Sequence, residues 1–276
     1  MVRPDDAALA AAARVRVTMI VGAGDTGKST LAAGVAAALA GRGARVAVVD
    51  ADVGQSEIGP PTTVGLGRVR GPLGRLGDAE LLALEFIGDT SPVRRIAQTA
   101  DATGRLVRRA LADGFAHVIV DTGGLVEGPL GLALKRAKLR AVDPDLVIVV
   151  QRRDESARLA QALGGHDRPA VVRIVAAAAA TRRTQTQRRA YRDTTLRAYL
   201  SGAAAVDLPL ERVEPARGLS TVVEGLLVGV HGADDQTLGI GRVRAVDTER
   251  ARVVVETPVE SARIVRLVLG RTVWPS

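Results

Sequence analysis

The sequence V-G-A-G-D-T-G-K-S-T at residues 21–30 decides the fold of this chain. It fits the pattern G-x-x-x-x-G-K-[ST], in which glycines let a loop curl so that its backbone N–H groups surround phosphate oxygens. The lysine of this pattern reaches the β- and γ-phosphates of ATP, and the hydroxyl after it is offered to Mg²⁺. The residues predicted to bind ATP are Gly22, Ala23, Gly24, Asp25, Thr26, Gly27, Lys28, Ser29 and Thr30.

The segments on both sides of this loop agree with that prediction. Residues 15–21 form a short apolar run rich in β-branched side chains, which predicts a strand. Residues 28–40 are rich in alanine and leucine and predict a helix that ends at Gly41. The order strand, glycine loop, helix is the context of a phosphate-binding loop, and it disfavours a chance glycine turn.

Apolar runs and helical patterns then alternate along the chain. Strands are expected at residues 45–50, 117–121, 145–150 and 169–175, and helices at 92–113, 129–142 and 154–163. Residues 80–87 fit a strand or a short helix, and the Gly- and Arg-rich residues 65–77 are expected to be a loop. This alternation predicts an α/β P-loop NTPase fold, a parallel sheet with helices on both faces.

Acidic residues follow the second predicted strand. Asp50 and Asp52 stand at its carboxyl end, where ligands bind in folds of this class. One carboxylate is a candidate to hold Mg²⁺ together with Ser29, and the other is a candidate to accept a proton from an attacking hydroxyl; their assignment stays open. Gln55 is a candidate to orient a substrate. A solvated loop acid is an equally good interpretation of Asp52 taken alone.

The composition excludes some kinds of site. The 276-residue chain contains no cysteine, which excludes disulfides and thiolate-bound metals. No uncharged apolar run reaches about 18 residues, the length of a membrane span. Asp5 and Asp6 precede an alanine-rich run and fit a signal peptide poorly. We therefore expect a cytoplasmic protein without a membrane partner.

Arginine dominates the charge of the chain. The net charge is +8, and of the 38 Lys and Arg residues only Lys28, Lys135 and Lys138 are lysine. Such a balance fits a polyanionic partner, and a general bias towards arginine explains it equally well. Because aromatic residues make up only 2% of the chain, a nucleic acid would be held mainly through its phosphates.

The segment 181–200 predicts a basic helix, and the pattern of the chain changes soon after it. Arg183 and Arg188 are candidates to neutralise a transferring phosphoryl group, although the pattern alone favours an exposed basic helix. From about Leu208 short β-rich runs alternate with turns. The predicted organisation is an N-terminal extension at 1–13, a P-loop kinase domain at 14–205 with an arginine-bearing lid at about 176–200, and a β-rich domain at 206–276.

Four segments together resemble the polynucleotide 5′-hydroxyl kinase family, the P-loop RNA kinases of pre-mRNA cleavage and ribosomal-RNA processing. They read G-A-G-D-T-G-K-S-T (22–30), D-A-D-V-G-Q-S-E (50–57), D-T-G-G-L-V-E-G (121–128) and R-T-Q-T-Q-R-R-A-Y-R-D-T-T-L-R-A-Y-L (183–200). The first segment is generic, whereas the second and fourth are specific to the family. The resemblance covers the chain from about residue 14 to its end.

The resemblance implies transfer of the γ-phosphate of ATP to the 5′-hydroxyl end of a nucleic acid, single-stranded or duplex, with RNA favoured over DNA. By the same resemblance, Lys28 and Ser29 are expected to bind ATP and Mg²⁺. Asp52 is expected to activate the 5′-hydroxyl or to organise the metal. Protein partners are not specified by it.

The same resemblance implies roles for residues further along the chain. Gln55 contacts the nucleic acid, and Thr122 and Gly123 lie in a loop that contacts the P-loop lysine or the phosphates. Arg183 and Arg188 are lid arginines at the transferred phosphate.

Some features depart from the family or leave alternatives open. The third segment reads T-G-G-L where members often have T-x-G-W, and about 13 residues precede the first strand, where larger eukaryotic members carry a β domain. A regulatory NTPase and an ATP-binding scaffold in an RNA-processing complex are the alternative functions. A guanine-specific N-K-x-D motif is excluded, because the chain contains no asparagine.

Overall fold

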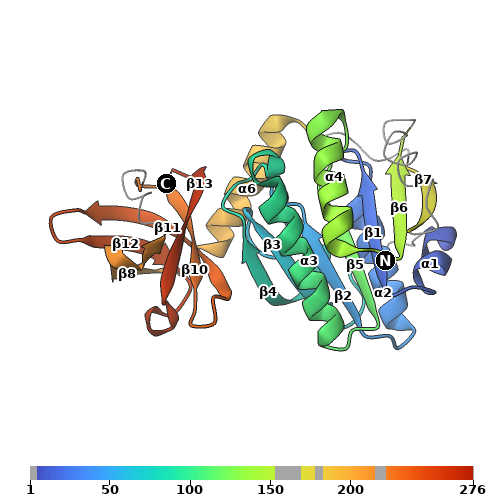
Figure 1. The fold of residues 1–276 in the computed structure, drawn as a ribbon, viewed down its shortest axis with the longest axis horizontal. Helices are drawn as coiled ribbons and strands as arrows, with labels where there is room; N and C mark the ends of the chain where they lie inside the picture. The colour runs from blue at the N-terminus through green and yellow to red at the C-terminus, as the bar shows by residue number, and fades with distance from the viewer. Residues whose placement is uncertain (1–4, 153–168, 178–182, 215–221, 276) are drawn as a thin grey trace.

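The structure is a computed structural model that describes residues 5–152, 169–177, 183–214 and 222–275 (Figure 1). The helix predicted at 154–163 lies outside these ranges, as do residues 178–182 of the predicted lid.

A parallel sheet forms the centre of the molecule. Its strands are β1 (Val17–Gly22), β2 (Val46–Ala51), β5 (His117–Thr122), β6 (Leu146–Gln151) and β7 (Ala170–Val175). They pair in the order β7-β6-β1-β5-β2, and every neighbouring pair is parallel. The predicted strands and the predicted α/β class are thus confirmed, and the carboxyl ends of β1, β2 and β5 lie at one edge.

Two antiparallel strands extend this sheet beyond β2. They are β3 (Thr63–Val69), paired with β2, and β4 (Glu80–Phe86), paired with β3. The prediction of a loop at 65–77 was therefore wrong for its first residues. Glycine lowers strand propensity, but here Gly67 allows close packing, since a Cβ at this position would come within 2.9 Å of the Ala79 Cβ.

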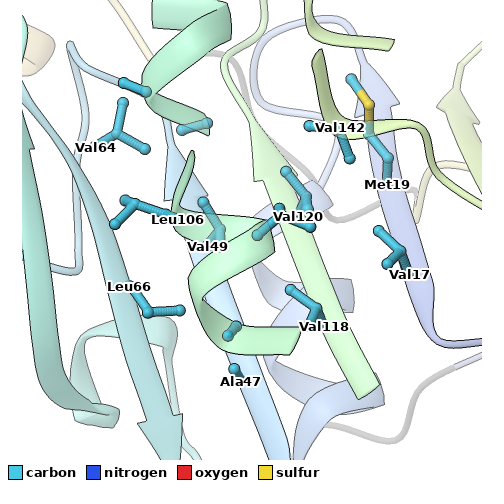
Figure 2. Close-up of a cluster of buried hydrophobic side chains, with 14 of the residues drawn as sticks. Val17, Met19, Ala47, Val49, Val64, Leu66, Leu106, Val118, Val120 and Val142 are labelled. Atoms are coloured by element: carbon cyan, nitrogen blue, oxygen red, sulfur yellow. The ribbon is translucent and has the colours of Figure 1, made fainter. Parts of the chain in front are cut away.

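Helices cover both faces of the sheet, as predicted. The helices are α1 (Asp6–Ala12), α2 (Lys28–Gly41), α3 (Ile96–Ala112) and α4 (Gly128–Val142), with 3₁₀ turns at Leu76–Asp78 and Pro92–Arg95. Alternate strand residues point to opposite faces. Met19 and Val120 therefore pack towards α3 and α4 (Figure 2), whereas Ile20 and Ile119 pack towards α1 and α2. No helix in the described ranges is both long and apolar enough to cross a membrane.

The C-terminal part is an antiparallel β structure with its own core. Its strands are β8 (Ala204–Pro209), β9 (Val213–Glu214), β10 (Leu226–His231), β11 (Thr237–Asp247), β12 (Arg252–Thr257) and β13 (Arg266–Val273), with 3₁₀ turns at Leu210–Arg212 and Ser261–Arg263. Most pairs are antiparallel, and β9 runs parallel to β13. The Leu84–Thr237 pair joins β4 to β11.

The helix α6 (Gln185–Tyr199) lies between the two parts, and we call it the lid helix (Figure 1). Thr184 caps its N-terminus by accepting a hydrogen bond from the Gln187 N–H at 3.1 Å. Its other end packs into a small cluster made by Leu196, Leu200, Leu227, Ile240 and Trp274. The lid helix is therefore held by the β-rich part at one end, while its first turns extend over the sheet edge.

Candidate active site

The predicted phosphate loop connects β1 to α2 at the carboxyl edge of the sheet. The side chain of Lys28 is buried there, and its Nζ donates to the Ala23 carbonyl at 2.5 Å. Burial lowers the Lys28 pKa, and the carboxylates of Asp121, Asp52 and Asp25 oppose that shift. A buried cation facing a loop of backbone N–H groups is a site for phosphate oxygens.

Ser29 and Asp121 form a close polar pair in this site. The Ser29 hydroxyl donates to the Asp121 Oδ2 at 2.5 Å, which joins the start of α2 to the end of β5. Burial raises the pKa of Asp121 to about 6, although Lys28 and the Ser29 hydrogen bond oppose the shift. A hydroxyl and a carboxylate side by side are oxygen ligands of the kind that Mg²⁺ prefers. The sequence showed Asp121 at a strand end, but our predicted metal set did not include it.

Asp50 holds the loop that follows β2. It is fully buried, and its carboxylate accepts hydrogen bonds from the N–H groups of Asp52 (3.0 Å), Glu57 (2.6 Å) and Ile58 (3.1 Å). Burial and the neighbouring Asp121 raise its pKa to about 8. These contacts favour a loop-organising role, and the assignment of Asp50 to a metal stays a prediction.

Asp52 lines the site and is held through one of its two carboxylate oxygens. Its Oδ1 accepts from the N–H groups of Gly54 and Gln55, both at 3.1 Å. Within the described ranges no donor is hydrogen-bonded to Oδ2. A carboxylate oriented by one oxygen and free at the other can accept a proton, as a general base requires.

The loop after β5 packs against the phosphate loop. Thr122 is buried, and its hydroxyl donates to the Ile20 carbonyl at 2.8 Å, so its predicted substrate contact stays a prediction. A Cβ at Gly123 would come within 3.2 Å of the Asp52 Cγ, and a Cβ at Gly124 within 2.5 Å of the Gly24 N. This loop therefore touches both Asp52 and the phosphate loop.

Two buried lysines beneath the site were missed by the sequence analysis. The Lys135 Nζ donates to the Thr122 Oγ1 at 2.9 Å and to the Gly123 carbonyl at 2.5 Å. The Lys138 Nζ donates to the Ala51 carbonyl at 2.7 Å. One signal could have found them: with Lys28 they are the only lysines of a strongly arginine-biased chain.

Two arginines contact the phosphate loop, Arg188 on the lid helix and Arg183 two residues before the helix begins. The Arg188 Nη2 donates to the Asp25 Oδ2 at 2.6 Å, and the Arg183 N–H donates to the same oxygen at 2.9 Å. Gln55 joins them, since its Nε2 donates to the Arg188 carbonyl at 3.2 Å and its Oε1 accepts from the Arg183 Nη1 at 3.5 Å. The predicted residues Asp25, Gln55, Arg183 and Arg188 are thus brought together.

Two cavities meet at Asp52 and the lid arginines. The smaller, of about 130 Å³, lies over the phosphate loop and is lined by Lys28 and Ser29. The larger, of about 510 Å³, lies on the other side and is lined by Lys138 and Arg192. Asp52, Gln55, Arg183 and Arg188 line both cavities. This arrangement suits two ligands that meet beside one carboxylate and two arginines.

Comparison with known proteins identifies relatives of this chain. Curated proteins similar to this chain include polyribonucleotide 5′-hydroxyl-kinases of Pyrococcus furiosus (33% identical over 197 residues) and Pyrococcus abyssi (34% over 196 residues). Each alignment covers 71% of this chain and 53% of the relative. The corresponding protein of Thermococcus kodakarensis is 40% identical over 134 residues, 48% of this chain and 37% of the relative. The chain thus spans about half or less of these relatives' length.

A solved structure supports the fold. The chain superposes on Clp1p, solved as a wild-type complex with residues 454–563 of Pcf11p, with a TM-score of 0.74 and 14% identity over 95% of this chain and 75% of that one. Residues 22–202 match the family model described as the P-loop of the mRNA cleavage and polyadenylation factor CLP1. The match spans more than half of the chain, from the phosphate loop to the end of the lid helix, and the chain therefore belongs to the CLP1 P-loop family.

Proposed function

We propose that this chain is an ATP-dependent polynucleotide kinase that transfers the γ-phosphate of ATP to the 5′-hydroxyl end of RNA. The observation that carries the proposal is the position of Asp52, between the phosphate-loop cavity and the larger cavity under the lid arginines. The names of the archaeal relatives support the same activity.

The small cavity is the proposed ATP site. The N–H groups of the phosphate loop and the positive end of α2 face the phosphates, and Lys28 turns from the Ala23 carbonyl to a phosphate oxygen. The Arg188 guanidinium exchanges its contact with Asp25, and the Arg183 guanidinium its contact with the Gln55 Oε1, for the γ-phosphate, whose charge the two groups neutralise during transfer.

The larger cavity is the proposed site for the acceptor end. A 5′-hydroxyl that enters it reaches the Asp52 Oδ2, which accepts the proton as the 5′-oxygen forms its bond to the γ-phosphorus. The bond between the γ-phosphorus and the β–γ bridging oxygen breaks at the same time, and ADP leaves. Catalysis rests mainly on alignment and charge neutralisation.

Ser29 and Asp121 are the residues proposed to hold Mg²⁺, and Asp52, which lines the same cavity as Ser29, is proposed to contribute through water. Their hard oxygen donors suit this ion. When bound, Mg²⁺ neutralises charge on the β- and γ-phosphates.

Label transfer tests the proposal. The parent protein receives γ-labelled ATP with matched 5′-hydroxyl RNA or DNA, beside Lys28→Ala, Asp52→Asn and Arg188→Ala. Arg250→Ala serves as the arginine control, because the Arg250 side chain is 85% exposed in a turn of the β-rich part. We expect labelled RNA ends from the parent and Arg250→Ala, and a loss of about 100-fold or more in the site variants.

Two other outcomes would contradict the kinase. Free phosphate without labelled ends would indicate an NTPase whose acceptor is water. Bound ATP that is neither hydrolysed nor transferred when RNA is present would indicate a scaffold.

A further inference from the structure

Lys135 and Lys138 occupy positions where lysine is costly. Both side chains are at most 1% exposed, and they stand three residues apart on α4, so they share one face of the helix. Burying an ammonium group without a paired charge in contact is unfavourable, and two neighbouring ammonium groups repel each other. Apolar side chains would fill this space at lower cost, so packing alone does not account for the pair.

The hydrogen bonds of the two lysines go to the carboxyl ends of two adjacent strands. The Lys138 Nζ donates at 2.7 Å to the carbonyl of Ala51, the residue directly before Asp52. The Lys135 Nζ donates at 2.5 Å to the carbonyl of Gly123, whose backbone packs against the Asp52 carboxylate. Asp52 therefore lies between two backbone segments, each held by one lysine.

A second contact extends this support to β1. The Lys135 Nζ also donates to the Thr122 hydroxyl at 2.9 Å, and that hydroxyl donates to the Ile20 carbonyl at 2.8 Å. The three strand ends that carry the site are thus joined through α4.

Burial shifts the pKa of both lysines, and the nearby carboxylates partly offset the shift. Burial lowers the pKa of Lys138 to about 8, while Asp52, Asp50 and Asp121 oppose this shift. Burial, with Lys138 and Lys28 nearby, lowers the pKa of Lys135 well below its ordinary value.

We propose that Lys135 and Lys138 are positioning residues for phosphate transfer, which fix the Asp52 carboxylate against the acceptor end through the carbonyls of Gly123 and Ala51. The inference rests on the proposed kinase activity. It states which residues hold the proposed general base, Asp52, in position. Because a displacement of about 1 Å at a reacting group can cost about 100-fold in rate, the two lysines should affect kcat far more than the KM for ATP.

Steady-state kinetics of Lys138→Met and Lys135→Met test the inference. Methionine has a similar length and no donor, and Val142→Ala is the control, since Val142 is a buried core residue at the far end of α4. We expect kcat to fall about 10- to 100-fold in the lysine variants, with the KM for ATP within twofold of the parent. Val142→Ala should lower the melting temperature and leave kcat unchanged. An unchanged kcat in both lysine variants would overturn the inference.

Chemical rescue separates positioning from stability. Because the chain has no cysteine, Lys138→Cys carries its sole thiol, which is alkylated in denaturant with bromoethylamine to rebuild a lysine-like amine, or with iodoethane as a neutral control. Both products are refolded and their melting temperatures measured.

The inference is supported if the amine product recovers kcat and the neutral product does not. The two products should also have the same melting temperature and the same affinity for ATP. If the neutral product does not fold, or if the losses of kcat follow losses of folded protein, the lysines are structural and the inference fails. If the parent protein does not label RNA, the proposed kinase activity is wrong. This outcome is seen in the parent protein alone, so it is distinct from a failure of the inference about the lysines.

Discussion

The Arg188 guanidinium of the lid helix is paired with the Asp25 carboxylate of the phosphate loop at 2.6 Å. The same guanidinium lies over Gly24, where a Cβ would come within 2.9 Å of the Arg188 Nη2. The proposed catalytic arginine is thus held at the place where phosphate oxygens are expected, by a residue of the predicted phosphate-binding loop. Asp25 therefore orients the Arg188 side chain in the absence of ATP.

Asp25→Asn should weaken this orientation. The pair is partly exposed, so its loss should cost about 1 kcal/mol, or about fivefold in kcat/KM for ATP. Phosphate transfer by Asp25→Asn, Arg188→Ala and the double variant gives the coupling. The double variant should lose little more than Arg188→Ala alone, and strictly additive losses would show that Asp25 does not act through Arg188.

Gly124→Ala should impair ATP binding without unfolding the protein. A Cβ at this position would meet the backbone N of Gly24 at 2.5 Å, which would displace the phosphate loop. We expect at least a tenfold rise in the Kd of ATP by calorimetry, about 1.4 kcal/mol.

Gly41→Ala is the matched control for this change. Gly41 is the last residue of α2, and a Cβ there would have no atom within 4 Å. ATP affinity should stay at the parent value in this variant. Equal affinity in both variants would mean that the phosphate loop tolerates the added methyl group.

Trp274 should report on the junction between the lid helix and the β-rich part. It is the sole tryptophan of the chain, and its Nε1 donates to the Asp193 Oδ1 of the lid helix at 3.1 Å. The guanidinium carbons of Arg242 and Arg197 lie 4.9 and 5.6 Å from its ring centre. Trp274→Ala should destabilise the protein by about 3–5 kcal/mol in urea unfolding followed by circular dichroism.

Trp274→Phe separates ring packing from the hydrogen bond. It keeps most of the buried ring and loses the donor to Asp193, so it should cost about 1 kcal/mol. Two variants of equal stability would show that the indole ring contributes nothing through its packing.

The stability of the protein should fall as the pH drops below the ordinary pKa of histidine because of His231. Burial and the nearby Arg266 lower the His231 pKa below 6.5, while Glu85 and Glu214 oppose the shift. The unfolded chain therefore takes up a proton at a higher pH than the folded chain, so unfolding becomes easier as the pH falls through about 6.5.

Urea unfolding at pH 7.5 and pH 5.5 checks this prediction. The loss of stability between the two pH values should be smaller in His231→Gln than in the parent, because the glutamine side chain does not titrate. The same pH dependence in both proteins would assign the effect to other groups.

Predictability varied between elements for physical reasons. The strands β1, β2, β5 and β6 are apolar runs buried on both faces, and this local pattern identifies them without tertiary information. β3 was missed because Gly65 and Gly67 resemble loop residues, and the packing that requires them involves Ile58 and Ala79 from other segments.

The candidate site likewise combines features that the local sequence pattern identifies with features that depend on tertiary packing. The sequence by itself determined the phosphate loop and the acidic residues after β2, because each depends on spacing within a few residues, and the family resemblance added the prediction of lid arginines. Only the tertiary structure decided that Asp121 pairs with Ser29, that Asp25 pairs with Arg188 and that Lys135 and Lys138 hold the strand ends around Asp52. These contacts join residues far apart in the chain, and the burial that gives them their energy does not exist until the sheet and α4 have packed together.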